Sequence, residues 1–148
     1  MSEKTKKSRL PMAVGLILLA AAGIWALTRV FGGGSSGIPG ETNQQRIEYI
    51  ESFGWNTGVT HCDLEEIRIP VNFDEIYEEY NDLQKKQGFD LRSYRAHSVK
   101  KYTYEISRSD DDPLPLYAEL LVENGVIIGA DITSAEAGGM MTVLAEPD

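Results

Sequence analysis

The 148-residue sequence contains one cysteine, Cys62, and few basic side chains. A single cysteine excludes an internal disulfide framework and a zinc site built from several cysteines. The 14 lysines and arginines are outnumbered by 23 aspartates and glutamates, which gives a net charge of −9. Because nucleic acid is bound by basic side chains that neutralise phosphates, the sequence predicts no nucleic-acid partner.

Charged residues are also absent from one long stretch near the start of the chain. None lies between Arg9 and Arg29, and the residues in that interval are mostly apolar. As a helix they span about 28 Å at ~1.5 Å per residue, close to the thickness of a hydrocarbon core. We therefore expect a transmembrane signal-anchor helix at residues 10–31, which places the lipid bilayer among the partners of the chain.

The two sides of this segment differ in charge. Residues 1–31 contain five basic residues and one acidic residue, a net charge of +4, so residues 32–148 carry −13. By the positive-inside rule, residues 1–9 form a cytoplasmic basic tail and the C-terminal domain lies outside a cell membrane that the chain crosses once. The alternative is a secreted protein, because Ala20, Ala21 and Ala22 offer the small residues of a signal-peptide cleavage site.

Glycine and serine dominate residues 32–40, which we interpret as a flexible linker. The spacing of Gly32, Gly34 and Gly37 matches a dinucleotide-binding pattern. That chemistry requires a preceding strand and a following helix, and Pro39 and Gly40 follow instead. We therefore predict no dinucleotide site here, and the rest of the sequence indicates no other cofactor and no metal site.

Residues 41–148 are expected to form an extracytoplasmic α+β domain: a small antiparallel sheet with two helices packed on one face. Helices are predicted at residues 43–53 and 73–87, and strands at 66–69, 99–107, 116–122 and 126–133. Thr42 and Gln45 have the spacing of a capping box before the first helix. The second helix has one apolar stripe, formed by Phe73, Ile76, Tyr77, Tyr80 and Leu83.

The last two strands are expected to form a hairpin. A three-residue loop, 123–125, places Leu120 opposite Ile128 and Ala118 opposite Ala130, which keeps the apolar side chains on one face. We therefore predict a type I turn with Gly125 in the left-handed region and a G1 bulge.

Several segments resemble a known family. They are Ile47–Trp55, Glu66–Pro70, Phe73–Tyr77, Tyr80–Gln84, Gln87–Leu91, Lys101–Glu105 and the hairpin Leu121–Asp131. Together they resemble the bacterial domain-of-unknown-function 4830 family over residues 47–133. The resemblance implies a small domain, commonly membrane-anchored or secreted, without an assigned role. It transfers no catalytic or binding residue.

Three groups of side chains are candidates for function. Cys62 with His61 or His97 has the residue types of a thiol nucleophile and its base. The second predicted helix carries acidic residues that repel one another at i,i+4 spacing, and two aromatic residues lie in predicted loops, which carry function more often than cores do. The partner-binding candidates are Trp55, Tyr94, Glu75, Glu78, Glu79 and Asp82.

No convincing catalytic constellation emerges from these residues, so the sequence favours a non-catalytic binding module at the bacterial cell envelope. Its partner is expected to be a protein or peptide, cationic rather than anionic, bound at a strand edge or at the acidic helix. Two alternatives are an envelope enzyme that uses Cys62 with a histidine, and a regulatory subunit of a membrane complex.

Overall fold

The computed structural model describes residues 37–109, 115–136 and 139–145. The chain divides into two units, residues 1–34 and 35–148. The basic tail, the expected transmembrane helix at 10–31 and most of the linker lie outside the described residues. Within the described residues, no helix is long and apolar enough to cross a membrane.

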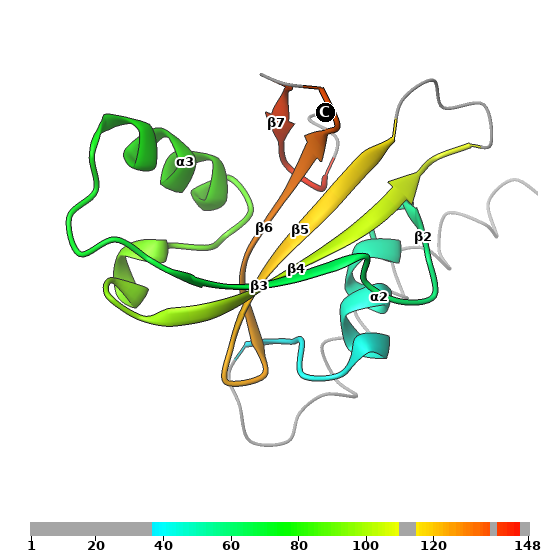
Figure 1. Ribbon diagram of the computed structural model, residues 1–148, viewed down its shortest axis with the longest axis horizontal. Helices are drawn as coiled ribbons and strands as arrows, with labels where there is room; N and C mark the ends of the chain where they lie inside the picture. Colours follow the sequence, from blue (N-terminus) through cyan, green and yellow to red (C-terminus); the bar gives the residue numbers. More distant parts are fainter. Residues whose placement is uncertain (1–36, 110–114, 137–138, 146–148) are drawn as a thin grey trace, which may run out of the picture. The chain divides into compact units, whose positions relative to one another are not determined.

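The second unit contains an antiparallel sheet in the order β1-β6-β5-β4-β2, with β3 also paired to β4 and β7 to β6 (Figure 1). The expected α+β fold is confirmed. The strands are β1 (Ile38–Pro39), β2 (Asn56–Thr57), β3 (Asp63–Arg68), β4 (Ser98–Ser107), β5 (Leu116–Glu123), β6 (Val126–Ser134) and β7 (Met141–Thr142). The helices are α2 (Asn43–Glu51), α3 (Glu75–Lys85) and a 3-10 turn, η1 (Leu91–Tyr94).

Side-chain caps define where both α-helices begin. The Thr42 hydroxyl accepts a hydrogen bond from the Gln45 amide at 3.2 Å, and the Gln45 side chain accepts one from the Thr42 amide at 3.1 Å. This confirms the predicted capping box. Asp74 caps α3 by accepting from the Tyr77 amide at 2.8 Å, so α3 begins at Glu75 rather than at Phe73.

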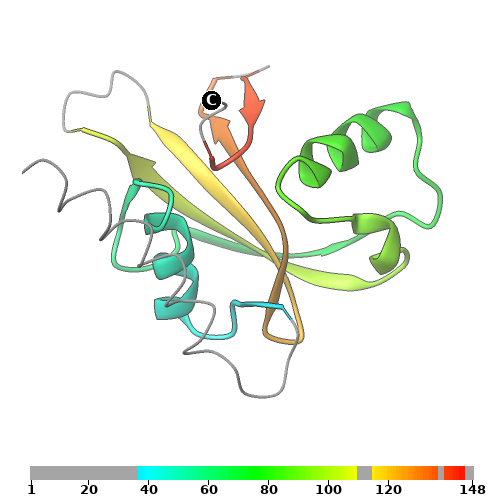
Figure 2. The ribbon, with the colours of Figure 1, turned by 180° about the vertical axis from the view of Figure 1, so that it is seen from behind.

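The two helices lie on opposite sides of the sheet, and the prediction that both pack on one face is wrong (Figures 1 and 2). The side chains of α2 join a cluster that includes Leu120 and Val122 of β5. Aromatic residues of α3 instead pack against a second cluster that includes Leu121. Successive side chains of a strand point to opposite faces, so the apolar run 120–122 supplies both clusters.

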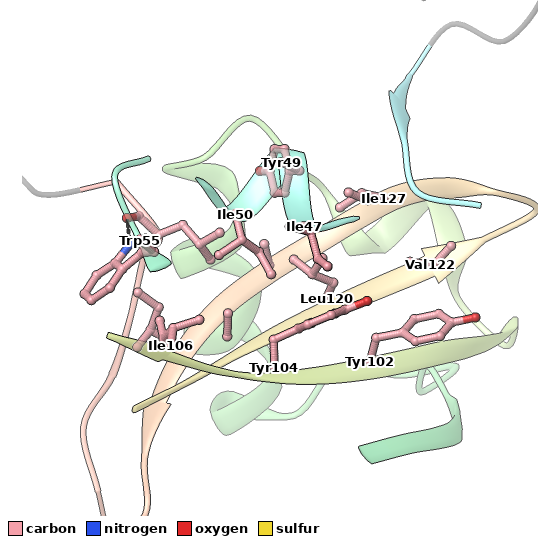
Figure 3. Packing of buried hydrophobic residues seen from close by; sticks show 14 of the residues in the cluster. Ile47, Tyr49, Ile50, Trp55, Tyr102, Tyr104, Ile106, Leu120, Val122 and Ile127 are labelled. Atoms are coloured by element: carbon pink, nitrogen blue, oxygen red, sulfur yellow. Dashed lines mark hydrogen bonds between the residues drawn. The ribbon is translucent and has the colours of Figure 1, made fainter. Parts of the chain in front are cut away.

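The larger cluster lies between α2 and the central strands. Figure 3 shows Ile47 and Ile50 of α2 pointing toward Leu120 and Tyr104 of the sheet. Ile50, Tyr104 and Leu120 have no exposed surface. Burying side chains of this size stabilises a fold by roughly 1.5–3 kcal/mol each, so this cluster is the main core of the domain.

The hairpin between β5 and β6 differs from the prediction. Glu123 pairs with Val126, so the loop has two residues, Asn124 and Gly125, with φ angles of 48° and 77°. Positive φ at both positions defines a type I′ turn. The predicted three-residue loop is therefore wrong.

A bulge within the strands keeps the apolar side chains on the correct faces. Val122 pairs with Ile127 but Leu121 pairs with Gly129, so Ile128 is the extra residue. Beyond the bulge, Leu120 lies opposite Ala130 rather than Ile128. The two-residue turn alone would have mixed the faces, and the bulge corrects the register.

The chain enters the domain through β1, which pairs with the start of β6. The Gly40 amide then donates to the Gly125 carbonyl at 2.8 Å. We expected residues 32–40 to be linker, but Ile38 and Pro39 belong to the sheet. They pair with β6 because the apolar side chain of Ile38 is half-buried against the main core.

Candidate functional site

The edge of the sheet at β3 is open. Within the described ranges β3 pairs only with β4, in a register from Asp63 opposite Thr103 to Arg68 opposite Ser98. Five of its six residues are exposed, and Ile67 is half-buried. A strand edge of this kind presents unpaired backbone donors and acceptors, which is the arrangement that accepts an added strand.

Backbone alternation identifies which residues of β3 face the open side. The Ile69 amide, just beyond β3, donates to the His97 carbonyl of the neighbouring chain at 3.0 Å. In an antiparallel ladder such bonds recur at every second residue. The amides of Glu65 and Ile67 therefore face β4, and those of Leu64, Glu66 and Arg68 face outward.

A cleft of about 630 Å³ lies beside this edge. Glu66 of β3 lies opposite Lys100, which in turn lies opposite Val122, so these side chains share one face of the sheet. The walls come from the segment before α2 and from the β5–β6 turn. The lining of the cleft includes Glu41, Glu66, Lys100, Tyr102, Glu123 and Gly125.

The carboxylates of this cleft differ in their partners. Glu123 Oε1 lies 2.5 Å from His97 Nδ1, so one carboxylate is occupied. In the part of the chain that the structure describes, the side chains of Glu41 and Glu66 form no ion pair. Two carboxylates in the cleft are therefore available to a cation, and Lys100 is the competing positive charge.

The buried Arg46 holds one wall of the cleft in place. Its Nη1 donates to the Gly40 carbonyl at 2.7 Å and to the Glu41 carbonyl at 2.8 Å. Its Nε donates to the Tyr104 hydroxyl at 2.9 Å, and its guanidinium lies 3.7 Å from the centre of the Tyr102 ring. A planar guanidinium can satisfy several acceptors and stack at once, which fixes Glu41 beside the sheet.

Two of the four predicted acidic residues of α3 form ion pairs within the protein. Glu78 pairs with Arg92, and Asp82 pairs with Lys85 at 3.0 Å. Glu75 and Glu79 are exposed, and among the described residues neither forms an ion pair. The like charges of this helix are thus partly neutralised by its own neighbours, which weakens it as a binding surface.

The two predicted aromatic residues have different positions. Trp55 is only 8% exposed, and its Nε1 donates to the Leu144 carbonyl at 2.9 Å. Trp55 therefore belongs to the main core, and little of its surface is open to a partner. Tyr94 is half-buried, with its ring 6.0 Å from the ring of His97, and His97 in turn contacts Glu123 of the cleft.

The residues of the thiol hypothesis do not converge. Cys62 is exposed, and its Sγ lies 3.4 Å from the Thr103 carbonyl. The His61 ring instead packs edge-on against Tyr102, 5.3 Å away. His97 adjoins the opposite end of the β3–β4 pairing, roughly 20 Å along the strand at ~3.3 Å per residue. Neither histidine is placed to activate the thiol.

A buried polar pair between α3 and β6 is absent from the sequence-based candidates. Asp131 has no exposed surface and accepts a hydrogen bond from the Tyr80 hydroxyl at 2.8 Å. Burial raises the pKa of Asp131 to about 7, although the hydrogen bond from Tyr80 acts in the opposite direction. In the pairing of β5 with β6, Asp131 lies directly opposite Glu119. Neither residue lines the cleft beside β3, and we regard the pair as structural.

Two glutamines complete the attachment of α3. Gln84 accepts from the Ala130 amide at 2.8 Å, and Gln87 donates to the Ala130 carbonyl at 2.6 Å. They occupy the edge of β6 between the short stretches paired with β1 and β7. The sheet therefore has one edge covered by side chains at β6 and one open edge at β3.

The comparisons with known proteins identify a family. The sequence model described as Domain of unknown function (DUF4830) matches residues 49–132, which is more than half of the chain. No curated protein and no solved structure matches. The match runs from the end of α2 through most of β6, so it includes β3 and the floor of the cleft but neither Glu41 nor Arg46. The chain belongs to the DUF4830 family.

Proposed function

We propose that this protein is a membrane-anchored extracytoplasmic binding module that takes an extended, basic segment of a partner protein as an added strand along β3. The observation that carries the proposal is the open edge of β3, with outward-facing amides at Leu64, Glu66 and Arg68. Main-chain hydrogen bonds to such an edge supply affinity without any catalytic group.

Charge supports a cationic partner. The strand itself carries Asp63, Glu65 and Glu66 against one basic residue, Arg68. Glu65 is held by Lys101 at 2.9 Å, which leaves Glu66 facing the cleft without a pair among the described residues. Opposite charges on directly facing strand residues stabilise pairing, whereas like charges oppose it. A basic strand is therefore favoured over an acidic strand.

The anchor and the orientation remain proposals from the sequence. The uncharged stretch between Arg9 and Arg29 is long enough to span a bilayer, and most of the flanking positive charge precedes it. A tether of this kind would hold the module at the outer surface of the membrane, where it meets segments of envelope proteins at high effective concentration.

Amide hydrogen exchange on the full-length protein tests the binding mode. The probe is a synthetic peptide of alternating lysine and valine, and the control is a peptide of alternating glutamate and valine. Binding should slow exchange at Leu64, Glu66 and Arg68. The amides of Glu65 and Ile67 already face β4 and serve as internal controls. Equal exchange at Glu66 with and without the lysine peptide would contradict strand addition.

A further inference from the structure

We infer that the cleft beside β3 is a specificity pocket for one lysine or arginine side chain of the bound segment, held between Glu66 and Glu41. The inference rests on the proposed strand addition and names the chemistry that the site selects. It depends on the side-chain register of β3, on the two carboxylates without ion pairs, and on the wall that Arg46 holds.

The register directs one side chain of an added strand toward the cleft. Leu64, Glu66 and Arg68 share a face of β3, and Glu66 is the one that lines the cleft. Residues directly opposite across antiparallel strands have Cβ atoms about 4.5–5.5 Å apart. The residue of the segment that pairs with Glu66 therefore projects its side chain over the same cleft.

The neighbouring positions predict the rest of the pattern. Leu64 is 46% exposed, so an apolar side chain opposite it would cover apolar surface. Arg68 is exposed and forms no ion pair among the described residues, so it favours an acidic residue opposite. Along one face the preferred segment is thus apolar, basic and acidic at alternate positions.

The far wall of the cleft is held by hydrogen bonds and close contacts within the protein. Arg46 is 4% exposed and donates hydrogen bonds to the carbonyls of Gly40 and Glu41. On the other side, a Cβ at Gly125 would lie only 3.1 Å from the Glu41 Cβ. The Glu41 backbone is therefore fixed against the turn, and pre-organisation of this kind reduces the entropy lost on binding.

Lys100 limits how strongly the cleft prefers a basic side chain. It lies directly opposite Glu66 in the ladder and lines the same cleft, yet no ion pair between the two is formed. The incoming cation must compete with this amine for the Glu66 carboxylate. Removing the Lys100 charge should therefore strengthen binding of a basic segment.

The test is a double-mutant cycle on full-length protein, with Kd measured by fluorescence anisotropy. Two labelled peptides of alternating valine and threonine are compared, one with a central lysine and one with a central norleucine of nearly equal length. Wild-type protein should prefer lysine about three- to fivefold, as expected for a partly exposed ion pair. Glu66→Gln should abolish the preference, Glu41→Gln should reduce it, and Lys100→Met should increase it.

Glu65→Gln is the matched control, since Glu65 neighbours Glu66 but pairs with Lys101 on the opposite face. It should leave the lysine preference unchanged. If Glu65→Gln and Glu66→Gln reduce the preference equally, only general electrostatics operates and the pocket is refuted. If both peptides slow exchange at the β3 amides but bind equally to wild type, the pocket is refuted and strand addition stands. If neither slows exchange, strand addition itself fails.

Discussion

The Tyr80 hydroxyl donates a 2.8 Å hydrogen bond to Oδ2 of Asp131 and so ties α3 to β6 inside the protein. The carboxyl is buried with Glu119 opposite and Lys101 nearby, and these charges act on it in opposite senses. An acid in such a position costs stability when it ionises. It therefore links the attachment of α3 to pH.

Stability should fall as the pH rises toward neutrality. Asp131 has a pKa of about 7 in the folded protein against an ordinary value of 3.8. The folded state binds this proton more tightly, so the contribution is fully present below pH 4 and is lost as the pH rises through 7. Asp131→Asn should remove this loss. From pH 5 to pH 8, the free energy of unfolding of the variant should therefore rise relative to that of the wild type by on the order of 2–4 kcal/mol. Urea unfolding at both pH values measures it, and parallel pH profiles for the two proteins would contradict the prediction.

Tyr80→Phe should change the pH dependence of stability in the opposite sense to Asp131→Asn. The phenol stabilises the ionised carboxylate, so its removal raises the pKa of Asp131 further. The variant should lose about 1.5–3 kcal/mol at pH 8, the range for a hydrogen bond to a charged group, and less at pH 5. Tyr77→Phe is the control, because the Tyr77 side chain makes no hydrogen bond in the described part of the chain. A loss independent of pH would rule out this role.

Arg46→Ala should destabilise the domain by about 3 kcal/mol, since it leaves the carbonyls of Gly40 and Glu41 without their donor and removes a stacked cation from Tyr102. Arg46→Lys keeps the charge but lacks the planar fork, so it should recover only part of the loss. Chemical denaturation gives the free energies. Full recovery by lysine would show that charge alone matters.

Gly125→Ala should cost about 1–2 kcal/mol. Its φ of 77° is unfavourable for alanine, and the new Cβ would press on Glu41 at 3.1 Å. Gly58→Ala is the matched control, because its added Cβ would meet only the Thr60 carbonyl at an ordinary 3.6 Å. Thermal or urea unfolding compares the two variants. Equal effects would argue against a strained turn.

The exposed Cys62 provides a direct test of orientation. It is the only cysteine of the sequence, and its side chain is accessible in the folded domain. If residues 32–148 lie outside the cell, a membrane-impermeant maleimide should label the protein in intact cells. Cys62→Ser is the control for specificity. Labelling only after lysis would contradict the proposed orientation, and a mature N-terminus at Gly23 would contradict the anchor.

The sequence predicts the long elements well because their periodic patterns are strong. Both helices and the three long strands were expected, and Thr42 caps α2 as predicted. It does not predict the two-residue strands β1, β2 and β7, which are too short to show a pattern and form only through pairing with longer strands. The bulge at Ile128 was missed for a related reason, because one extra residue leaves no local signal.

The candidate site was less predictable than the fold. The sequence suggests a strand edge as one candidate binding surface. Which strand has an open edge depends on the pairing of the whole sheet, and the sequence does not predict it. Arg46 has no local signal in the sequence, since nothing beside it indicates that its partners will be backbone carbonyls and two tyrosines. The continuous apolar run Leu120–Val122 did carry information, because a strand that is apolar on both faces is covered on both.

The hydrogen bonds from Arg46 to the Gly40 and Glu41 carbonyls also have a mechanical consequence. Tension applied to the chain ahead of Gly37 would act first on the two residue pairs that join β1 to β6. It would then meet Gly40 and Glu41, whose carbonyls are held by a side chain rooted in the core. We therefore expect these two hydrogen bonds to resist force from the N-terminal side before it reaches α2. The wall of the cleft should then keep its shape when the chain ahead of Gly37 is pulled.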